Sequence, residues 1–353
     1  MFEKFKLFVN LFKVRISLTI VLCAISGVFI VPNNNLNTLE LFLVAISVFL
    51  ASAGVSAFNQ YFERDLDALM PRTSKRPFVT GELIPHIMWP ILFLSITLSG
   101  LMISYFFINP YSCFYNFLGA LFYGAIYTIW LKRKSIWNIV IGGLAGSFAT
   151  LAGSAAVSPI ITPEAVVLSV VLFLWTPPHF WSLAMAIGDD YKKAGVPMLP
   201  NILSNSLTSY IILFHTIILV FVTTLLMLYN SSILYIMAIF IGGGYFIWTS
   251  ILLAIKKTKS AAMKNFFGSF VQTSFEKTCL YFDPASEPKT PFPKDSSEQR
   301  FVDIEPLIRL APTLHQQAVP HESFFLADPS MLWFYHQAVH EAGGTKKPFA
   351  PLC

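Results

Sequence analysis

Three oxygen-bearing side chains recur at every fourth position where a long apolar run ends. They are Asn59, Glu63 and Asp67, in the stretch Asn-Gln-Tyr-Phe-Glu-Arg-Asp-Leu-Asp. At about 100° per residue, a helix places all three on one face and turns Asp65 away from it. Mg²⁺ favours one or two carboxylates together with water and substrate phosphate. This face is therefore a candidate magnesium platform.

Two arginines follow the acids, one helical turn apart and beyond the helix-breaking Pro71. Arg72 and Arg76 could each grip phosphate oxygens through paired hydrogen bonds. The alternative is a solvated loop whose charges serve only topology and surface pairing. Topology explains the arginines but not the spaced acids, because the rule that orients membrane helices is nearly blind to Asp and Glu. The pattern favours a site for a metal ion and a phosphorylated ligand.

A second polar stretch joins a histidine to a pair of acids further along the chain. Pro177 and Pro178 are expected to break or kink a helix just before His179. Asp190 returns to nearly the same face as His179 if the helix continues. We interpret Asp190 as part of a second acidic platform. His179 lies deep in an apolar stretch, where packing or hydrogen bonding explains it as well as catalysis does.

Two acidic platforms beside basic residues suit a ligand with a polyanionic head and an apolar tail, such as a lipid diphosphate. The matching chemistry is ionisation of an allylic diphosphate, in which a metal neutralises the charge on the leaving group. An aromatic, water-poor chamber would stabilise the allylic cation. Tyr123 and Tyr127, one turn apart, are candidates for its lining, although aromatic residues at this spacing are more often core packing.

The composition places these residues in a membrane protein. Of 353 residues, 55% are hydrophobic, 34 are Phe and only 12% are charged, whereas a soluble protein carries about 25% charge. A soluble enzyme, a disordered chain and a disulfide-rich secreted module are excluded. The net charge of +5 reports topology and does not indicate a nucleic-acid partner. The four cysteines form no CxxC pair, which argues against disulfides and structural zinc.

Long apolar runs predict an all-α, polytopic transmembrane bundle. Each run is about 16–25 residues, enough to cross a hydrocarbon core of about 30 Å. Every Lys and Arg up to residue 264 lies before the first run or after the second, fourth, sixth or eighth. The N-terminus and these loops are therefore expected to be cytoplasmic, and no cleavable signal peptide is expected. The predicted spans are 16–31, 39–58, 87–108, 111–131, 136–157, 163–187, 210–229 and 233–255.

After residue 256 the apolar runs stop, and prolines and acids accumulate. We expect no further span there but a cytoplasmic, mostly irregular tail with a short helix around 330–341. His336 and His340 lie one turn apart beside Glu341 in that helix. Two solvated histidines are the better interpretation, because a zinc site needs further ligands.

These motifs resemble those of the UbiA-type intramembrane prenyltransferases, and within them the branch of the protoheme IX farnesyltransferases. The superfamily's first motif is similar to the stretch Asn59, Gln60, Glu63, Asp67, Arg72-Thr73 and Arg76-Pro77, where Gln60 and Glu63 depart from its Asp residues. The heme branch is indicated by three further stretches, which are 127–143, Trp175-Thr-Pro-Pro-His-Phe-Trp and Asp190-Tyr-Lys-Lys-Ala-Gly-Val-Pro-Met-Leu-Pro.

The resemblance implies an enzyme that uses Mg²⁺ to transfer a farnesyl group from farnesyl diphosphate to a vinyl group of protoheme IX (heme B), giving heme O. It implies that Asp190 joins Asn59, Glu63 and Asp67 in holding metal. It further implies that Lys132 and Asn138 join Arg72 and Arg76 in holding diphosphate, and that His179 lies on the heme side. Asp67, Asp190 and His179 are the implied catalytic residues.

The resemblance also implies partners and a location. The partners are farnesyl diphosphate, heme B, membrane lipid and the proteins of heme A synthesis or terminal oxidase assembly, with no nucleic acid. The location is the cell inner membrane rather than the mitochondrial one, with the N-terminus and the tail cytoplasmic.

The likeness covers residues 10–265, so we expect a prenyltransferase domain at 1–265 and a polar tail without family likeness at 266–353. Because the family usually has nine spans, we expect the ninth to be missing, through a truncated or frame-shifted end or a lineage-specific extension. Two other functions stay open, an intramembrane prenyltransferase with a quinone-precursor or chlorophyllide acceptor and a non-enzymatic ion carrier. The carrier is disfavoured because the acids gather at one surface and no inverted repeat is visible.

Overall fold

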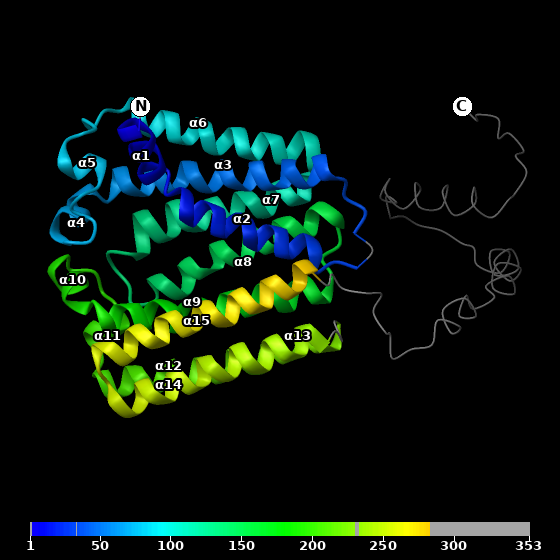
Figure 1. Cartoon of the computed structure of the whole chain (residues 1–353). Coiled ribbons are helices and arrows are strands. Elements are labelled where there is room, and N and C mark those ends of the chain that lie inside the picture. The colour runs from blue at the N-terminus through cyan, green and yellow to red at the C-terminus, as the bar shows by residue number, and fades with distance from the viewer. Residues whose placement is uncertain (1, 33, 230–232, 283–353) are drawn as a thin grey trace, which may run out of the picture. The chain divides into compact units, whose positions relative to one another are not determined.

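The computed structural model describes residues 2–32, 34–229 and 233–282, which contain helices and no strand. The long helices run side by side in one bundle, and the short α4, α5, α10 and α11 gather at one end of it (Figure 1). We call this the charged end, because the polar loops described above lie there. The predicted Ser330–Glu341 helix with its two histidines lies outside the described residues.

The predicted spans are confirmed as helices in a multi-pass membrane protein, with ends that differ by a few residues. Among the described residues, 7 helices are long and apolar enough to cross a membrane, and α2 (Val14–Phe29) is a shorter apolar helix. The seven are α3 (Thr38–Phe62), α6 with η1 (Met88–Ile108), α7 with η2 (Pro110–Leu131), α8 (Asn138–Val157), α9 (Pro163–Ala186), α12 with η3 (Asn205–Leu228), and α13, η4 and α14 (Ile233–Lys256).

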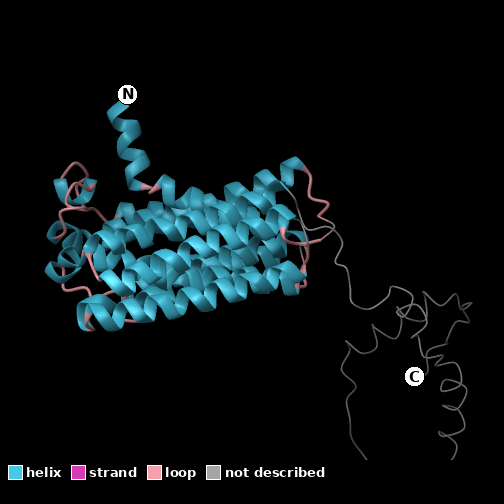
Figure 2. Cartoon of the chain, turned by 60° about the horizontal axis from the view of Figure 1, so that its bottom comes forward, coloured by secondary structure: helices cyan, strands magenta, loops and turns pink. Residues whose placement is uncertain are grey.

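Short helices flank the spans. They are α1 (Phe2–Leu11), α4 (Arg64–Leu69), α5 (Pro77–Thr80), α10 (Gly188–Lys193) and α11 (Leu199–Ile202). Figure 2 shows α1 standing away from the direction of the bundle helices. The chain turns from α1 into α2 at Lys13, whose φ of 44° is the left-handed conformation.

Several spans depart from regular α-helix along their length. The segments η1 (Ser104–Ile108), η2 (Phe122–Leu131) and η4 (Ile239–Gly243) are π-helical, and η3 (Leu226–Leu228) is a 3-10 turn. Such π segments are rare and occur often at functional sites. The longest of them, η2, reaches the charged end and carries both tyrosines predicted to line a chamber.

The adjacent prolines do not interrupt α9, where we had expected a break or kink. The helix runs without interruption from Pro163 to Ala186, with Pro177 and Pro178 inside it. Each proline removes one backbone hydrogen bond. Packing of α9 against α8, α12 and α15 holds the segment in helical form, and the Ser182 hydroxyl donates to the carbonyl of Pro178 at 2.6 Å.

A further long helix, α15 (Lys259–Phe282), lies in the bundle against α9 and α14. This corrects our expectation of an irregular segment after residue 256, and α15 runs without a break across the predicted boundary at 265. Among the described residues α15 is not one of the helices long and apolar enough to cross a membrane, so the absence of a ninth apolar span stays a prediction. It is less apolar than the spans, and part of its polar content faces inward. Asn265, Ser269 and Gln272 are buried, whereas Phe267 is exposed. A hydropathy value averaged over the whole segment does not identify a membrane helix whose polar face is buried. Hydrogen bonds to neighbouring helices stabilise such a helix.

The helix α15 runs along the bundle. It begins at the charged end and finishes at the opposite end (Figure 1), as a helix of 24 residues with a length of about 36 Å must. We had expected the chain after α14 to stay on the side of the N-terminus, which assumed no ninth helix. The last described residue, Phe282, lies instead at the end opposite the charged loops.

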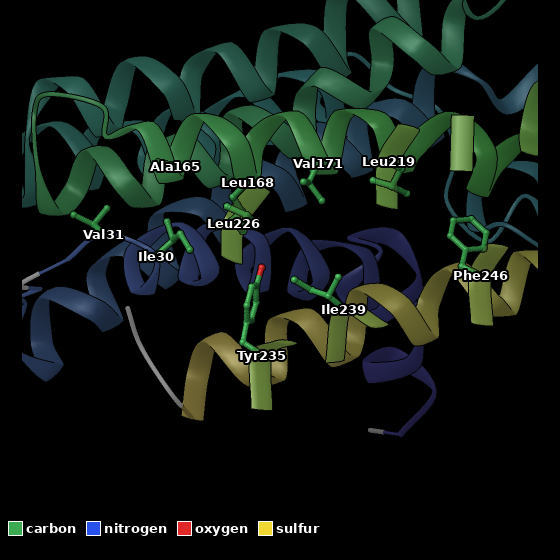
Figure 3. Packing of buried hydrophobic residues seen from close by; sticks show 10 residues of the cluster. All are labelled: Ile30, Val31, Ala165, Leu168, Val171, Leu219, Leu226, Tyr235, Ile239 and Phe246. Carbon is green, nitrogen blue, oxygen red and sulfur yellow. The ribbon is translucent and has the colours of Figure 1, made fainter. Parts of the chain in front are cut away.

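Apolar packing closes the far half of the bundle. One cluster joins Ile30 and Val31, which follow α2, with residues of α9, α12, η3, α13, η4 and α14 (Figure 3). The helices α2 and α8 approach so closely that a Cβ on Gly27 or Gly153 would overlap the backbone of the facing helix. This contact fixes α2, and with it the turn at Lys13, against the centre of the bundle.

Candidate functional site

A cavity of about 650 Å³ opens among the helices next to the charged end. Its walls change character along its length, from charged residues near the loops to apolar and aromatic residues further in. The charged part is lined by Lys13, Asn59, Asp67, Arg72, Arg76 and Lys132. The remainder includes Ile20, Cys23, Val48, Val55, Ala120, Tyr123, Tyr127, Leu172, Trp175, His179, Phe180, Leu183 and Phe270.

Asn59 is held in one orientation at the end of α3. Its Nδ2 donates to Oγ1 of Thr128 at 3.0 Å, and its Oδ1 accepts from Nζ of Lys13 at 2.5 Å. Thr128 in turn donates its hydroxyl proton to the carbonyl of Tyr123, five residues earlier in the π-helix, at 2.8 Å. Because the hydroxyl proton is already donated to Tyr123, the Thr128 oxygen can only accept a hydrogen bond from Asn59. The amide oxygen of Asn59 therefore faces the charged groups of the cavity.

The two acids of the first platform are fully buried, and each is paired with one cation. Glu63 Oε2 accepts from Nζ of Lys132 at 2.5 Å, and Asp67 Oδ2 accepts from Nη1 of Arg76 at 2.5 Å. The chain leaves regular helix at Glu63 and resumes it in α4. The helix face predicted for Asn59, Glu63 and Asp67 thus bends here, but all three side chains stay buried at the charged end.

The second oxygen of each carboxylate fits a divalent cation. Glu63 Oε1 and Asp67 Oδ1 are buried and have no hydrogen-bond partner, which is costly for a charged group unless a ligand completes the site. The described His, Cys, Asp and Glu residues form no group of three that could hold a metal ion. A sparse site finished by water and phosphate is what Mg²⁺ accepts.

Lys13 is a site residue that the sequence did not single out. Its left-handed backbone turns the side chain toward the cavity, where Nζ contacts Asn59 and lies 3.3 Å from the Tyr123 hydroxyl. Burial, and then the nearby charge of Arg76, lower the pKa of Lys13 to about 7. A bound anion would favour the charged ammonium again. Lys13 resembled the other basic residues that precede the first span, so only its contacts reveal it.

Arg72 and Arg76 differ in their surroundings. Arg72 is exposed on the cavity rim and makes no ion pair with any described residue. Arg76 is largely buried against Asp67. One arginine is therefore free to meet an incoming anion, while the other already lies beside the buried acids.

The loop between η2 and α8 holds the platform from the other side. Lys132 pairs with Glu63, and Arg133 pairs with Asp65. Asp65 faces away from the cavity, as predicted. Asn138 is buried and does not line the cavity. Its Nδ2 donates to the carbonyls of Ser135 at 2.6 Å and Pro197 at 3.0 Å. In the structure Asn138 thus ties this loop to the loop after α10.

The second predicted platform reaches the cavity through a tyrosine. Tyr191 lines the cavity, whereas Asp190 is half-buried and does not. Asp189 faces outward and pairs with Lys259 at 2.6 Å. The two charged loops still meet, because Met70 of the first packs in one cluster with Tyr191 and others of the second.

An aromatic box surrounds His179 on α9. The imidazole stacks on Trp175 at 4.2 Å between ring centroids and packs against Phe180, Phe266 and Phe270. Its Nδ1 lies 2.7 Å from the Ser269 hydroxyl. Half of this box comes from α15, the helix that the sequence did not predict.

The tyrosines predicted to line a chamber do so. The Tyr123 and Tyr127 rings stack at 6.0 Å, and both line the cavity. The Lys132 ammonium lies 5.6 Å from the centroid of the Tyr127 ring. These two rings therefore stand between the charged part of the cavity and its apolar part.

Comparison with known proteins identifies the family of this chain. The family described as the UbiA prenyltransferase family matches residues 20–271. Protoheme IX farnesyltransferase 2 of Paramagnetospirillum magneticum is 44% identical over 279 residues, covering 79% of this chain and 97% of that protein. Protoheme IX farnesyltransferase of Rickettsia bellii is 35% identical over 269 residues, covering 74% of this chain and 86% of that protein.

Two solved structures share the fold. One, described as digeranylgeranylglyceryl phosphate synthase in membranes, has a TM-score of 0.67 at 22% identity and covers 79% of this chain and 98% of its own. The other, a UbiA homolog from Archaeoglobus fulgidus bound to GPP and Mg²⁺, has a TM-score of 0.56 at 16% identity and covers 78% and 99%. With a family match over most of its length and a bundle of the same fold, this chain belongs to the UbiA prenyltransferase family.

Proposed function

We propose that this chain transfers the farnesyl group of farnesyl diphosphate to a vinyl group of protoheme IX (heme B), giving heme O and diphosphate. The observation that carries the proposal is the pair of buried carboxylates, Glu63 and Asp67, each with one oxygen paired to a cation and one without a partner. Asp67 lines the charged end of a cavity that is otherwise apolar and aromatic, and Glu63 is buried behind the cavity-lining Lys132, with which it pairs. Relatives that align over most of their length carry the corresponding name.

The head of the donor binds at the charged end. Bound Mg²⁺, held by Asn59, Glu63 and Asp67, would neutralise the charge that builds on the departing diphosphate. Asp190 does not line the cavity but adjoins Tyr191, which does, and it is the ligand that we propose from the second loop. Arg72, Arg76, Lys132 and Lys13 supply positive charge to the same diphosphate from three different segments. Because Lys13, Arg76 and Lys132 are partly buried, their attraction for the anion is stronger than it would be in water. Asn138 supports them by tying the loop of Lys132 to the loop after α10.

The rings of Tyr123 and Tyr127 take the next position along the cavity. Breaking the bond between farnesyl carbon and diphosphate oxygen leaves an allylic cation, which the ring faces stabilise. The apolar wall keeps water away until the carbon–carbon bond to the vinyl group has formed. To complete the reaction, a water molecule adds its hydroxyl to the other vinyl carbon and releases one proton.

The aromatic box around His179 is the proposed acceptor side. The aromatic side chains of Trp175, His179 and Phe270 line the cavity, which suits a planar macrocycle. The hydrogen bond to Ser269 fixes the imidazole ring in one rotamer. Since half of this box comes from α15, we propose that the prenyltransferase domain extends past residue 265 through this helix.

We further propose that the protein lies in the cell inner membrane with its charged end toward the cytoplasm, since the lysines and arginines gather there. Its partners would then include membrane lipid and the proteins that convert heme O to heme A or assemble it into a terminal oxidase. Epitope tags placed in the loop at 132–137 and in the loop at 158–162 test the orientation by their accessibility in intact and opened cells.

The experiment that tests the function supplies membranes containing the full chain with heme B, farnesyl diphosphate and Mg²⁺. We expect heme O and diphosphate, with loss of both in Asp67→Asn and a strong decrease in Asp190→Asn. Asp189→Asn, in the neighbouring acid that faces outward, is the matched control and should retain activity. Absence of heme O with the wild-type chain in active membranes would contradict the proposal.

A related activity on a quinone-precursor acid or a chlorophyllide uses the same donor site. Competition separates the two possibilities, because heme B should inhibit transfer to any such acceptor and should itself be the better substrate. His179→Phe should raise the KM for heme B while leaving the affinity for farnesyl diphosphate unchanged. An ion carrier would bind Mg²⁺ but would release no diphosphate.

A further inference from the structure

Gln60 lies on α3 beside Asn59 of the proposed metal site but points to a different part of the molecule. Its Nε2 donates to the carbonyl of Asn10 at 2.5 Å and to that of Leu11 at 3.0 Å, and its side chain is 2% exposed. These two carbonyls end α1. The last carbonyls of a helix have no partner within the helix, so both donor hydrogens of the Gln60 amide serve as a cap supplied from another element.

The chain that Gln60 caps leads directly into Lys13. Two residues after Leu11, Lys13 adopts the left-handed conformation, which is strained for a residue with a side chain. Such a conformation persists only where its surroundings hold it. The turn is held by Gln60, by the buried Leu11 and Phe12, and by the Ser17 hydroxyl, which donates to the carbonyl of Phe12 at 3.2 Å.

The left-handed turn decides where the Lys13 ammonium lies. From this turn Nζ reaches Asn59 Oδ1 at 2.5 Å and the Tyr123 hydroxyl at 3.3 Å. Adjacent residues of α3 thus act on both ends of Lys13, since Gln60 holds the backbone before it and Asn59 accepts from its side chain.

We infer that Gln60 is a positioning residue for diphosphate binding, because its amide fixes the α1–α2 turn that aims Lys13 into the cavity. The inference rests on the proposed function to the extent that Lys13 meets the diphosphate of the donor. A carboxylate cannot donate to the carbonyls of Asn10 and Leu11, so only an amide can cap α1 in this way.

The test measures binding of inorganic pyrophosphate with Mg²⁺ to the full chain in lipid nanodiscs by calorimetry. Gln60→Met keeps the size of the side chain and removes the donors. We expect the dissociation constant to rise about tenfold, as for the loss of one or two hydrogen bonds. Lys13→Met should raise it at least as much. The double variant should bind no more weakly than Lys13→Met alone, because Gln60 acts only through Lys13.

Gln272→Met is the matched control. Gln272 is also 2% exposed, on α15, and makes one amide contact at 3.5 Å to Thr223 away from the cavity. A comparable decrease in melting temperature for Gln60→Met and Gln272→Met, with weaker pyrophosphate binding only for the former, supports positioning. Unchanged binding in Gln60→Met or in Lys13→Met, or additive losses in the double variant, would overturn it. Because this readout needs no acceptor, it stands apart from any failure to form heme O.

Discussion

The Lys132 ammonium lies 2.5 Å from Oε2 of Glu63 and joins two loops that are 69 residues apart in the sequence. The side chain of Lys132 is 12% exposed and that of Glu63 is 1% exposed, so this ion pair is almost completely shielded from solvent. A buried pair of this kind holds the structure together chiefly because neither charge can be left alone.

Lys132→Met should therefore destabilise the protein by about 3–5 kcal/mol, since it leaves a buried carboxylate without its counter-ion. Removing both charges in Glu63→Met with Lys132→Met should restore most of that stability while diphosphate release stays absent. The measurement is thermal unfolding in one detergent. Lys259→Met removes a cation from the exposed pair with Asp189 and should leave the melting temperature unchanged. An equal loss in the two single lysine variants would contradict this account.

Thr128→Val should weaken the response to Mg²⁺ by about 10–100-fold, as loss of an outer-shell partner commonly does. Valine no longer accepts from Asn59, so the amide is free to turn its nitrogen toward the cavity. The concentration of Mg²⁺ that gives half-maximal diphosphate release reports this change. Thr128→Ser should behave as the wild type. Thr216→Val, at a buried threonine of α12 that bonds to Ile212 and Ser250, controls for the loss of a buried hydroxyl.

Gly153→Ala should lower stability by about 1–3 kcal/mol through overpacking of the contact between α2 and α8. A Cβ there would overlap the carbonyl of Ala24, whereas a Cβ on Gly146, on the same helix, would meet no atom within 4 Å. Gly146→Ala is thus the matched control and should leave the melting temperature unchanged or slightly raised. A similar loss in both variants would indicate an effect of helix α8 itself rather than of its contact.

The exposed pair of Asp65 and Arg133 should make a small, pH-dependent contribution to stability. The hydrogen bond from Arg133 holds the pKa of Asp65 below its usual value. A lowered folded pKa contributes stability above the unfolded pKa of about 3.9, and this is lost as the pH falls through the folded value. Because the pair is exposed, its contribution should stay below about 1 kcal/mol and decrease with salt.

The difference in melting temperature between the wild type and Arg133→Gln measures it. This difference should be constant from neutral pH down to about pH 5 and should shrink below about pH 4. A difference that grows as the pH falls would show that Arg133 stabilises the protein by another route.

The local spacing of apolar and acidic residues in the sequence was enough to predict the membrane spans and the position of the first acidic platform. Apolar runs of the right length form helices in a bilayer because every backbone group must be satisfied within the segment. The four-residue spacing of Asn59, Glu63 and Asp67 brought them to one buried place even though the helix bends at Glu63. The distribution of lysine and arginine marked one end of the bundle, where the charged loops indeed gather.

Partners distant in the sequence could not be predicted in the same way. Lys13 looked like one basic residue among several, and only contacts with Asn59 and Tyr123, 46 and 110 residues away, show it in the site. The sequence did not show that Tyr191 rather than Asp190 would line the cavity, or that Asn138 would tie two loops together. A residue's helical face can be counted from the sequence, but which neighbour meets that face cannot.

The sequence by itself therefore determined the all-helical membrane bundle, its charged end and the residue types that suit a metal ion and a diphosphate. Tertiary structure decided which cation pairs with which acid, how the Asn59 amide is oriented, and that α15 completes the aromatic box around His179. Hydropathy averages over a whole helix, so it misses one whose polar face is satisfied inside the protein and whose apolar face meets lipid. Only packing reveals that arrangement, because it depends on hydrogen bonds between helices that are far apart in the chain.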